Sequence, residues 1–295
     1  MDDREWDRLV EQIKQGDCTP FLGAGACSGT LPLAAELSRE WAELHDYPFT
    51  DNANLAEVIQ YVVARTEGDA VFVKRKVAAE LKARGLPNFS RPHQPHLVLA
   101  KQPISVFLTT NYDDFMTKAL SNARKDPVTV VCPWYLGAED DEATHFPKNY
   151  IPSVERPLVY HLHGSFEHPP SMVLTQEDYL EFLITLAKDR GMGSNRLVPK
   201  QVLPAMTRKP LLFLGYGLRD MSFRMLFRGL YSTLAEVQRR RHVSIQLTPV
   251  RGGDRAARRR AEDYLRYHYD QLRISVHWGT VDRFCAELAQ RLELA

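Results

Sequence analysis

The sequence predicts an α/β fold, built on a Rossmann-like parallel sheet of about six strands with helices on both faces and a helical insertion. Two observations predict this fold. Short apolar runs alternate with amphipathic helical patterns along the 295 residues, as in a parallel sheet that helices cover on both faces. Several of the runs also end in glycine or polar residues, and the carboxyl ends of parallel strands are where such sheets bind ligands.

Six apolar runs have the length and composition of buried strands. Each holds four to eight residues, mostly Val, Ile, Leu and Phe, which is too short for a helix and too apolar for an exposed strand. The runs are CTPFLG (18–23), ISVFLTTN (104–111), PLVYHLHG (157–164), PLLFLGYG (210–217), HVSIQLTP (242–249) and RISVHWG (273–279). A further short strand is expected near 128–132, before an irregular stretch at 133–156.

Helical patterns occupy most of the intervening chain. Helices are predicted at 3–15, 31–44, 113–123, 220–238, 254–269 and 280–293. Residues 53–85 and 177–204 also have helical patterns, but no strand follows either of them. We therefore expect one domain over 1–295 with helical insertions at 45–90 and 170–205, reached through the proline-containing segments 91–96 and 168–170. His93 and His96 flank prolines and are expected in a loop.

Charge and cysteine content exclude several classes of protein. Lys and Arg together number 38 against 37 Asp and Glu, a formal net charge of +1, so no overall field attracts nucleic acid or an anionic membrane. The four cysteines lack CxxC spacing, which argues against a disulfide framework and against a four-thiolate zinc site. The start of the chain has no signal-peptide pattern, and no stretch has the roughly 18 to 20 apolar residues of a membrane span. We expect a cytoplasmic protein without membrane contact.

A glycine turn follows the first strand, in the segment FLGAGACSG. Gly23, Gly25 and Gly29 form the pattern GxGxxxG, and backbone N–H groups at the start of the following helix can face a pyrophosphate. A Cβ atom at these glycines would block that approach. The spacing departs from GxGxxG, and no acidic residue ends a strand about 20 residues later, so a dehydrogenase is disfavoured. A tight turn without a ligand remains the alternative.

Two polar motifs follow the next strands. TTNYDD brings Thr110, Asn111 and Asp113 to the carboxyl edge of the sheet, where they can face the ligand crevice or cap the next helix. In HLHG, His163 is the last residue before a glycine, and a neutral imidazole there can act as a general base. The alternative for His163 is a hydrogen-bonded structural histidine, the role that we assign to His161.

A second glycine turn, FLGYGLRD, places Gly215, Tyr216 and Gly217 after another strand and ahead of Asp220, which opens a helix. Ribose or phosphate can approach such a turn closely, although a turn with an N-cap gives the same pattern. Trp278 and Gly279 end the last strand at the same rim. A metal site built from His161, His163 and His168 with Cys132 or an aspartate is a weaker alternative, and no metal is predicted.

The four motifs, in this order, resemble the sirtuin-like family, and specifically its bacterial branch that hydrolyses NAD. Smaller matches at VLTQEDYLEF (173–182), VSIQL and RISVHWGTVDRF extend the resemblance over about the whole chain. The resemblance implies that NAD is the substrate, that Asn111 lies beside the nicotinamide ribose, that His163 is the general base and that Asp113 is a nicotinamide-side or orienting group. The residues expected to bind the rest of NAD are Gly23, Ala24, Gly25, Ser28, Thr110, Gly215 and Tyr216.

Two departures from protein-deacetylating sirtuins indicate which reaction to expect. Those enzymes carry a four-cysteine zinc module, which the dispersed cysteines here cannot form. They also follow the glycine turn with a GIPDFR-like segment, where this chain has GTLPLAAEL. Both differences favour consumption of NAD by water, giving nicotinamide and ADP-ribose or a cyclised form.

The resemblance also implies antiphage defence by NAD depletion, and an enzyme of this kind must be restrained. We therefore expect a homo-oligomer, or a partner such as a HerA-like ATPase or another defence protein, with residues 45–90 and 170–205 as contact surfaces. Two other functions stay open. One is a nucleic-acid-binding or nuclease-associated module of a defence complex, which would use the basic runs Arg239–His242 and Arg255–Arg260. The other is a sensor that binds NAD or ADP-ribose without turnover.

Overall fold

A computed structural model describes residues 1–135, 137–188, 197–218, 224, 225, 227, 240–248 and 254–293. The predicted helix at 220–238 lies outside this part of the chain except for three residues. Asp220 and Arg239 also lie outside it.

Seven parallel strands form one sheet in the order β3-β4-β2-β1-β5-β6-β7. The strands are β1 (Thr19–Leu22), β2 (Val106–Thr109), β3 (Val128–Val131), β4 (Leu158–His161), β5 (Leu211–Leu214), β6 (His242–Gln246) and β7 (Ile274–Trp278). Phe21 of β1 is in register with Leu108 of β2 on one side and with Phe213 of β5 on the other. The predicted α/β class is confirmed. The short strand expected near 128–132 is a full member of the sheet and makes it seven-stranded.

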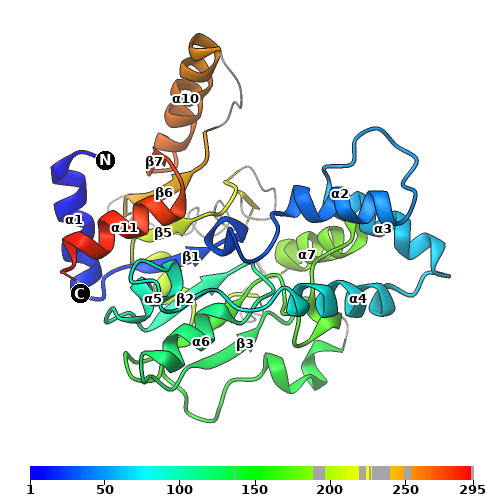
Figure 1. The fold of residues 1–295 in the computed structure, drawn as a ribbon. Coiled ribbons are helices and arrows are strands. Elements are labelled where there is room, and N and C mark those ends of the chain that lie inside the picture. Colours follow the sequence, from blue (N-terminus) through cyan, green and yellow to red (C-terminus); the bar gives the residue numbers. More distant parts are fainter. Residues whose placement is uncertain are drawn as a thin grey trace.

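Helices pack against both faces of the sheet (Figure 1). They are α1 (Asp3–Lys14), α2 (Ala34–Leu44), α3 (Leu55–Arg65), α4 (Ala70–Ala83), α5 (Pro95–Ala100), α6 (Phe115–Asn122), α7 (Gln176–Lys188), α8 (Leu203–Thr207), α10 (Arg255–Asp270) and α11 (Val281–Arg291). Successive strand residues enter different cores because side chains alternate along a strand. Phe21 and Phe213 belong to one cluster, while Leu22 lies in another with side chains of α1, α5, α6 and α11.

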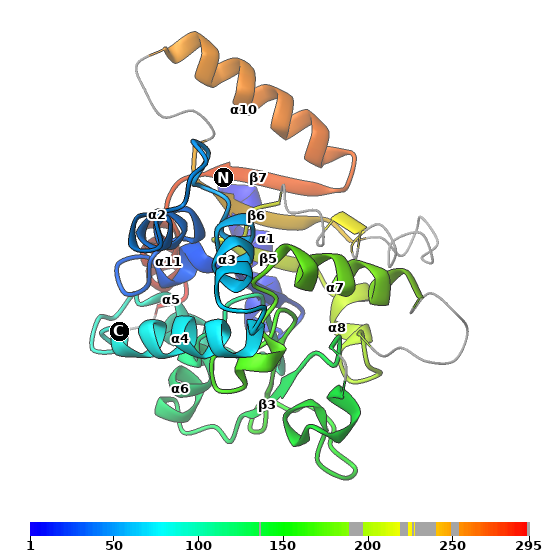
Figure 2. The same ribbon diagram turned by 90° about the vertical axis from the view of Figure 1, so that its right-hand side faces the viewer.

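Helices α2, α3 and α4 share a third apolar cluster beside the sheet (Figures 1 and 2). Val58, Ile59 and Val73 are fully buried in it. Helix α7 packs on α3, and the Lys74 ammonium on α4 forms a 2.7 Å ion pair with the Asp178 carboxylate on α7. Helices α3, α4 and α7 fall in the segments that the sequence predicts to be insertions, whereas α2 precedes the first of them. The division of the chain into one domain with two insertions stays a prediction.

Helix α5 occupies a segment that was expected to be a loop. Gln94 caps it by accepting a hydrogen bond from the Leu97 N–H (2.8 Å), and Pro95 stands at its first position, where a missing N–H costs nothing. His96 is consequently buried in a helix, with 1% of its surface exposed. The prediction that His96 is a loop residue is wrong, because the proline opens a helix at this position.

The boundaries of other elements differ by a few residues from the predicted ones. After Gly23 the chain forms a short 3-10 helix, Ala24–Cys27, and α2 begins only at Ala34. Strand β4 ends at His161, so His163 lies in the turn that follows and not in the strand. Helix α10 projects from the end of the sheet next to β7 (Figure 1). None of the described helices is long and apolar enough to cross a membrane.

Candidate active site

The two glycine turns pack directly on each other at the centre of the sheet. The Gly23 N–H donates to the Leu214 carbonyl and the Gly25 N–H to the Gly215 carbonyl, each at 3.0 Å. A Cβ on Gly25 would lie 2.7 Å from Gly215 Cα, and a Cβ on Gly215, whose φ is +66°, would lie 2.4 Å from the Ala26 nitrogen. These glycines therefore allow two backbones to approach each other. The sequence had suggested a different reason, the approach of a phosphate.

The turns lie where the strand order reverses. From β1 the chain continues to β2 and β4 on one side, and β5 returns to the other side of β1. In open α/β sheets, a crevice outside the carboxyl ends of the strands forms at such a reversal. The turns at 23–25 and 215–217 follow β1 and β5, and the segment 110–113 follows β2, so three of the predicted motifs meet at this crevice.

The side-chain amide of Asn111 has a defined orientation. Its Nδ2 donates to the Gly23 carbonyl at 3.1 Å and to the Cys27 sulfur at 3.2 Å. Since a carbonyl oxygen can only accept, the nitrogen must face Gly23. The amide oxygen Oδ1 is then the end of the side chain that remains to accept a hydrogen bond from a ligand. The backbone N–H of Asn111 donates to Thr109 Oγ1 at 2.9 Å, which holds the residue at the end of β2.

Asp113 is buried at the base of the same crevice. One carboxylate oxygen accepts from the Phe115 N–H at 3.0 Å, at the start of α6, and the other accepts from the Cys27 thiol at 3.1 Å. Burial raises the pKa of Asp113 to about 6, against the opposing effect of these hydrogen bonds. The N-cap residue of α6 is Asp114, so Asp113 stands one residue before the cap, where its bond to the Phe115 N–H holds the turn while the residue lines the cavity.

The two histidines of HLHG have different surroundings. The His161 Nδ1 lies 3.1 Å from the Asn111 carbonyl oxygen, and burial lowers the pKa of this imidazole to about 4. It is therefore a neutral, structural side chain that supports the segment carrying Asn111. The His163 ring packs edge-on against Tyr179 and Phe182, with centroids 5.7 and 5.2 Å away, and lines the crevice.

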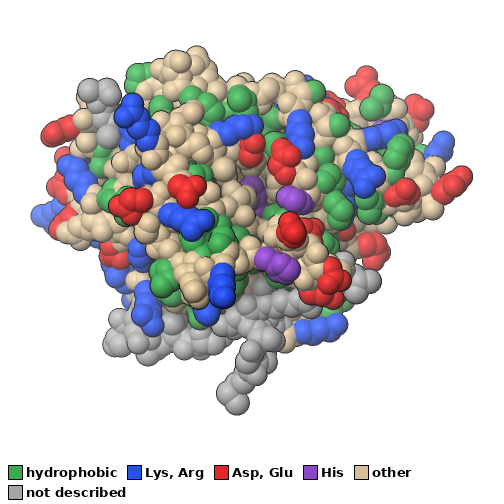
Figure 3. Space-filling model, turned by 90° about the horizontal axis from the view of Figure 1, so that it is seen from below, with side chains coloured by type: hydrophobic (Ala, Val, Ile, Leu, Met, Phe, Trp, Pro, Cys, Tyr) green, Lys and Arg blue, Asp and Glu red, His purple; other side chains and the backbone are tan. Residues whose placement is uncertain are grey.

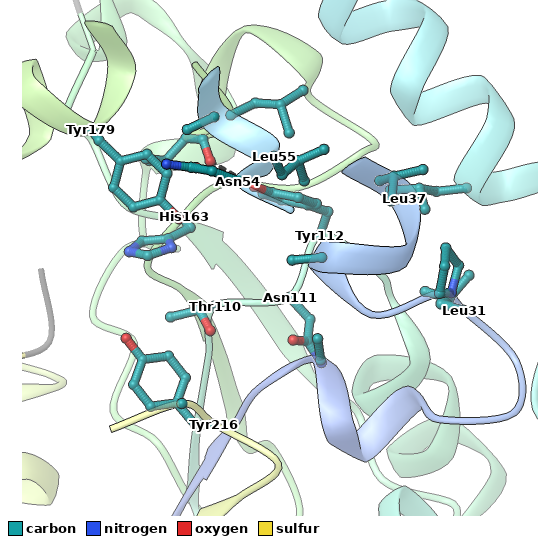
Figure 4. A pocket seen from close by; sticks show the side chains of 18 of the residues that line it. Leu31, Leu37, Asn54, Leu55, Thr110, Asn111, Tyr112, His163, Tyr179 and Tyr216 are labelled. Atoms are coloured by element: carbon teal, nitrogen blue, oxygen red, sulfur yellow. Dashed lines mark hydrogen bonds between the residues drawn. The ribbon is translucent and has the colours of Figure 1, made fainter. Parts of the chain in front are cut away.

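A cavity of about 1180 Å³ occupies the crevice. Figure 4 shows His163, Thr110 and Tyr216 along one side of it, Asn111 beside them, and Leu31 and Leu37 across from them. A second cavity of about 660 Å³ shares Ala24 and residues 215–217 with the first. Ligand pockets typically hold about 300 to 1,000 Å³, so the pair has room for a dinucleotide.

Nearly all the predicted site residues line these cavities. The larger one is lined by Ala24, Thr110, Asn111, Asp113, His163, Gly215 and Tyr216, and the second by Ala24, Gly25, Ser28, Gly215 and Tyr216. Gly23 lines neither of them. Its N–H donates to Leu214 and its carbonyl accepts from Asn111. Trp278 and Gly279 line the second cavity, at the rim that was expected.

Sequence reasoning missed the contribution of the helical segments. Asn54 and Leu55 at the start of α3, and Tyr179 and Leu183 on α7, line the larger cavity. No motif marks Asn54, Leu55 or Leu183, and the match at 173–182 contains Tyr179 without assigning it a role. An amphipathic helix reveals its apolar face but not what that face covers. Cys27 was also missed. It lies within the glycine-turn motif, and its burial with Asn111 could not be read from spacing.

One group of side chains among the described residues has the spacing to hold a metal ion. The ligand atoms of Cys27, His96 and Asp113 all lie within 4.8 Å of one another. In the same part of the chain, His161, His163 and His168 form no such group.

The first basic run takes part in ion pairs. Arg240 contacts Asp17 and Arg241 contacts Asp270, at 2.6 and 2.7 Å. On the face of the molecule that Figure 3 shows from below, the described charged side chains mix both signs. The ion pairs favour a structural role for Arg240 and Arg241 over a nucleic-acid surface.

Comparison with known proteins identifies the family. The model of the SIR2-like domain matches residues 105–269, more than half of the chain. The chain belongs to the SIR2-like domain family. This SIR2-like chain is 27% identical over 226 residues to the NAD(+) hydrolase ThsA of Acinetobacter baumannii (strain 532279), a match that covers 72% of the chain and 39% of that protein. It is 24% identical over 245 residues to the NAD(+) hydrolase ThsA of Enterococcus faecium, covering 79% and 44%.

The chain thus spans about two fifths of the length of the curated relatives it matches. A solved structure from work on the mechanism and regulation of Sir2 enzymes aligns over 99% of this chain and 98% of its own, with 13% identity and a TM-score of 0.45.

Proposed function

We propose that this SIR2-like chain binds NAD along the carboxyl edge of its sheet and hydrolyses the bond between nicotinamide and ribose. The observation that carries the proposal is that Asn111 and His163, from the ends of two different strands, line one cavity. That cavity adjoins a second one across the glycine turns, as an extended dinucleotide requires. The relatives named NAD(+) hydrolase support the same reaction.

The chemistry demands orientation and charge stabilisation more than a strong nucleophile. As the N-glycosidic bond breaks, positive charge develops on the ribose and neutral nicotinamide leaves. Asn111 Oδ1, turned outward because Nδ2 is bound to Gly23 and Cys27, accepts a hydrogen bond from a ribose hydroxyl or from the attacking water. His163 accepts the proton of that water. Each such contribution is worth about 10² to 10⁴-fold in rate.

Asp113 acts as an orienting group in this proposal. Both of its carboxylate oxygens accept hydrogen bonds from the protein, so it holds the segment at the base of the cavity. Thr110, Gly215 and Tyr216 flank the ribose, and Ala24, Gly25 and Ser28 contribute to the second cavity, which takes the adenosine half.

The proposal is tested by incubating the purified chain with NAD and separating the products by chromatography. We expect nicotinamide together with ADP-ribose or its cyclised form, and a loss of at least 100-fold in rate in both Asn111→Ala and His163→Ala. His145→Ala, which removes an exposed histidine away from both cavities, is the control and should keep the wild-type rate. Full activity in both site variants would refute the proposal. Binding of NAD without turnover by the wild-type chain would favour the sensor.

We also propose that the reaction serves antiphage defence in the cytoplasm and that assembly restrains it. A second copy of the chain or a HerA-like ATPase would contact the helical segments at 45–90 and 170–205. Measuring mass and NAD cleavage with and without a co-expressed neighbouring protein tests this. A lone monomer with full activity in both conditions would contradict it.

A further inference from the structure

A buried group of polar side chains forms part of the wall of the larger cavity, and its centre is the Cys27 thiol. The Cys27 sulfur accepts from Asn111 Nδ2 at 3.2 Å, donates to Asp113 Oδ2 at 3.1 Å and lies 3.9 Å from His96 Nε2. All four residues are at least nine-tenths buried. The thiol therefore contacts two of the residues of the TTNYDD motif that line the cavity, Asn111 and Asp113.

The position of the hydrogen on His96 follows from its neighbours. Gln94 Oε1 accepts from the Leu97 N–H at 2.8 Å, which turns the Gln94 NH2 group toward His96 Nδ1, also at 2.8 Å. An amide nitrogen only donates, so Nδ1 must be the accepting nitrogen. The hydrogen of this neutral imidazole is then on Nε2, the nitrogen that faces the Cys27 sulfur.

This tautomer argues against a metal ion in the group. To bind a metal, Nε2 needs its lone pair, and the hydrogen would have to move to Nδ1 and meet the Gln94 NH2 group. Turning the Gln94 amide over would relieve that contact but would remove the cap of α5 at Leu97. A metal also needs the thiolate, whereas burial, followed by the neighbouring Asp113 charge, raises the pKa of Cys27 well above its usual value.

We propose that Cys27 is a positioning residue whose thiol orients the Asn111 amide and the Asp113 carboxylate through hydrogen bonds, with His96 completing a metal-free network. The proposal rests on the NAD-cleaving function proposed above. Cys27 supplies the second of the two acceptors that fix Asn111 Nδ2. Without it, the Gly23 carbonyl still keeps the amide nitrogen on its side, but a single hydrogen bond fixes the tilt of the amide less tightly, and Oδ1 is aimed less precisely.

The kinetic test compares two replacements of Cys27 with a matched control. Cys27→Ala removes the acceptor and the donor, and we expect kcat to fall about tenfold with little change in KM, the effect of one hydrogen bond lost in the transition state. Cys27→Ser keeps both functions and should stay within about threefold of wild type. Cys285→Ala removes an equally buried thiol from α11, away from both cavities, and should leave kcat unchanged. A Cys27→Ala rate equal to that of Cys285→Ala, or no rescue by serine, would overturn the proposal.

Two measurements on the whole chain do not depend on activity. The S–H stretching band of Cys27, assigned by subtracting the Cys27→Ala spectrum, should move to higher frequency in Asp113→Asn. The new amide oxygen is held by the Phe115 N–H, so its NH2 group faces the thiol and cannot accept the S–H hydrogen. An unmoved band would overturn the hydrogen bond. The purified wild-type protein should carry no bound zinc after dialysis against zinc. One equivalent that disappears in Cys27→Ala would show a metal site instead.

The outcomes separate the two proposals. A wild-type chain that leaves NAD intact refutes the hydrolase, while the infrared and zinc measurements still decide whether the network exists. An active chain in which Cys27→Ala behaves like the control refutes the positioning role alone.

Discussion

The buried ion pair between Lys74 and Asp178 links the helical segments to the cavity wall, and its removal should be costly. The exposed fractions of the two side chains are 5% and 12%. Asp178 Oδ2 also accepts from the Leu174 and Thr175 N–H groups, at 3.0 and 2.8 Å. Burial lowers the pKa of Lys74 and Asp178 opposes this, so Asp178→Ala leaves an ammonium that is buried without its counter-ion.

Removing one partner of a buried ion pair costs about 3 to 5 kcal/mol. Lys74 keeps its contacts to the Pro170 carbonyl and the Trp134 ring, but two backbone N–H groups lose their acceptor. We therefore expect Asp178→Ala to lower the free energy of unfolding by about 4 kcal/mol, and Tm by about 6 °C. Lys74→Met should cost less, about 1 to 2 kcal/mol, because the carboxylate keeps both backbone donors.

Urea and thermal unfolding of the purified variants measure these differences. Glu167→Ala, which breaks the exposed pair with Lys82 on the same helix α4, is the control and should cost less than about 1 kcal/mol. Because Val173 and Leu174 line the larger cavity, Asp178→Ala should also raise KM for NAD. If Asp178→Ala is no more destabilising than Glu167→Ala, the assignment of a buried, structurally important pair is refuted.

Two further predictions concern the glycine turns and pH. Gly215→Ala should lower the free energy of unfolding by at least about 2 kcal/mol, because φ is +66° and the new Cβ meets the backbone of residues 25 and 26. The control is Gly217→Ala, which has open space around its Cβ and should change stability by less than about 1 kcal/mol. Equal Tm values for the two variants would contradict this reasoning. Burial lowers the pKa of His96 and His161 to about 4 and that of His242 to about 3, so folding disfavours protonation of these groups and stability is lost as pH falls from 6.5 toward 4, by about 3 kcal/mol for each group. Burial raises the pKa of Asp113 to about 6, so this one group adds stability as pH falls from 6 to 4, but the three histidines together lose more. Tm measured from pH 7 to 4 should therefore fall. A flat profile would show that the histidines are not buried as described.

Local pattern was sufficient for the sheet and for most of its motifs. The strands at 19–22 and 211–214 are buried at every position, and the second is a continuous apolar run, as is typical of strands covered on both faces. The polar residues after β2 could be assigned to the ligand edge because every strand end in a parallel sheet faces the same way. The α5 segment was misjudged because a proline before a helix and a proline in a loop look alike in sequence until the cap is known.

The helical part of the site was beyond prediction for a different reason. The apolar face of an amphipathic helix indicates that this face is covered, but it does not indicate which part of the protein covers it. Neither Leu55 nor Tyr179 could therefore be assigned to the cavity. The same limit applies to Cys27, whose thiol meets Asn111 84 residues further along the chain.

The sequence by itself determined the class of fold, the edge of the sheet that carries the polar motifs and the identity of Asn111 and His163 as candidates, since hydrophobic period and strand-end chemistry are local properties. Only the tertiary structure decided that Gly25 and Gly215 are packing partners, that the Asn111 amide nitrogen faces Gly23, and that Cys27, His96 and Asp113 share one buried network. Each of those facts depends on strand order and on side-chain direction, which bring together residues distant along the chain and which no single segment encodes.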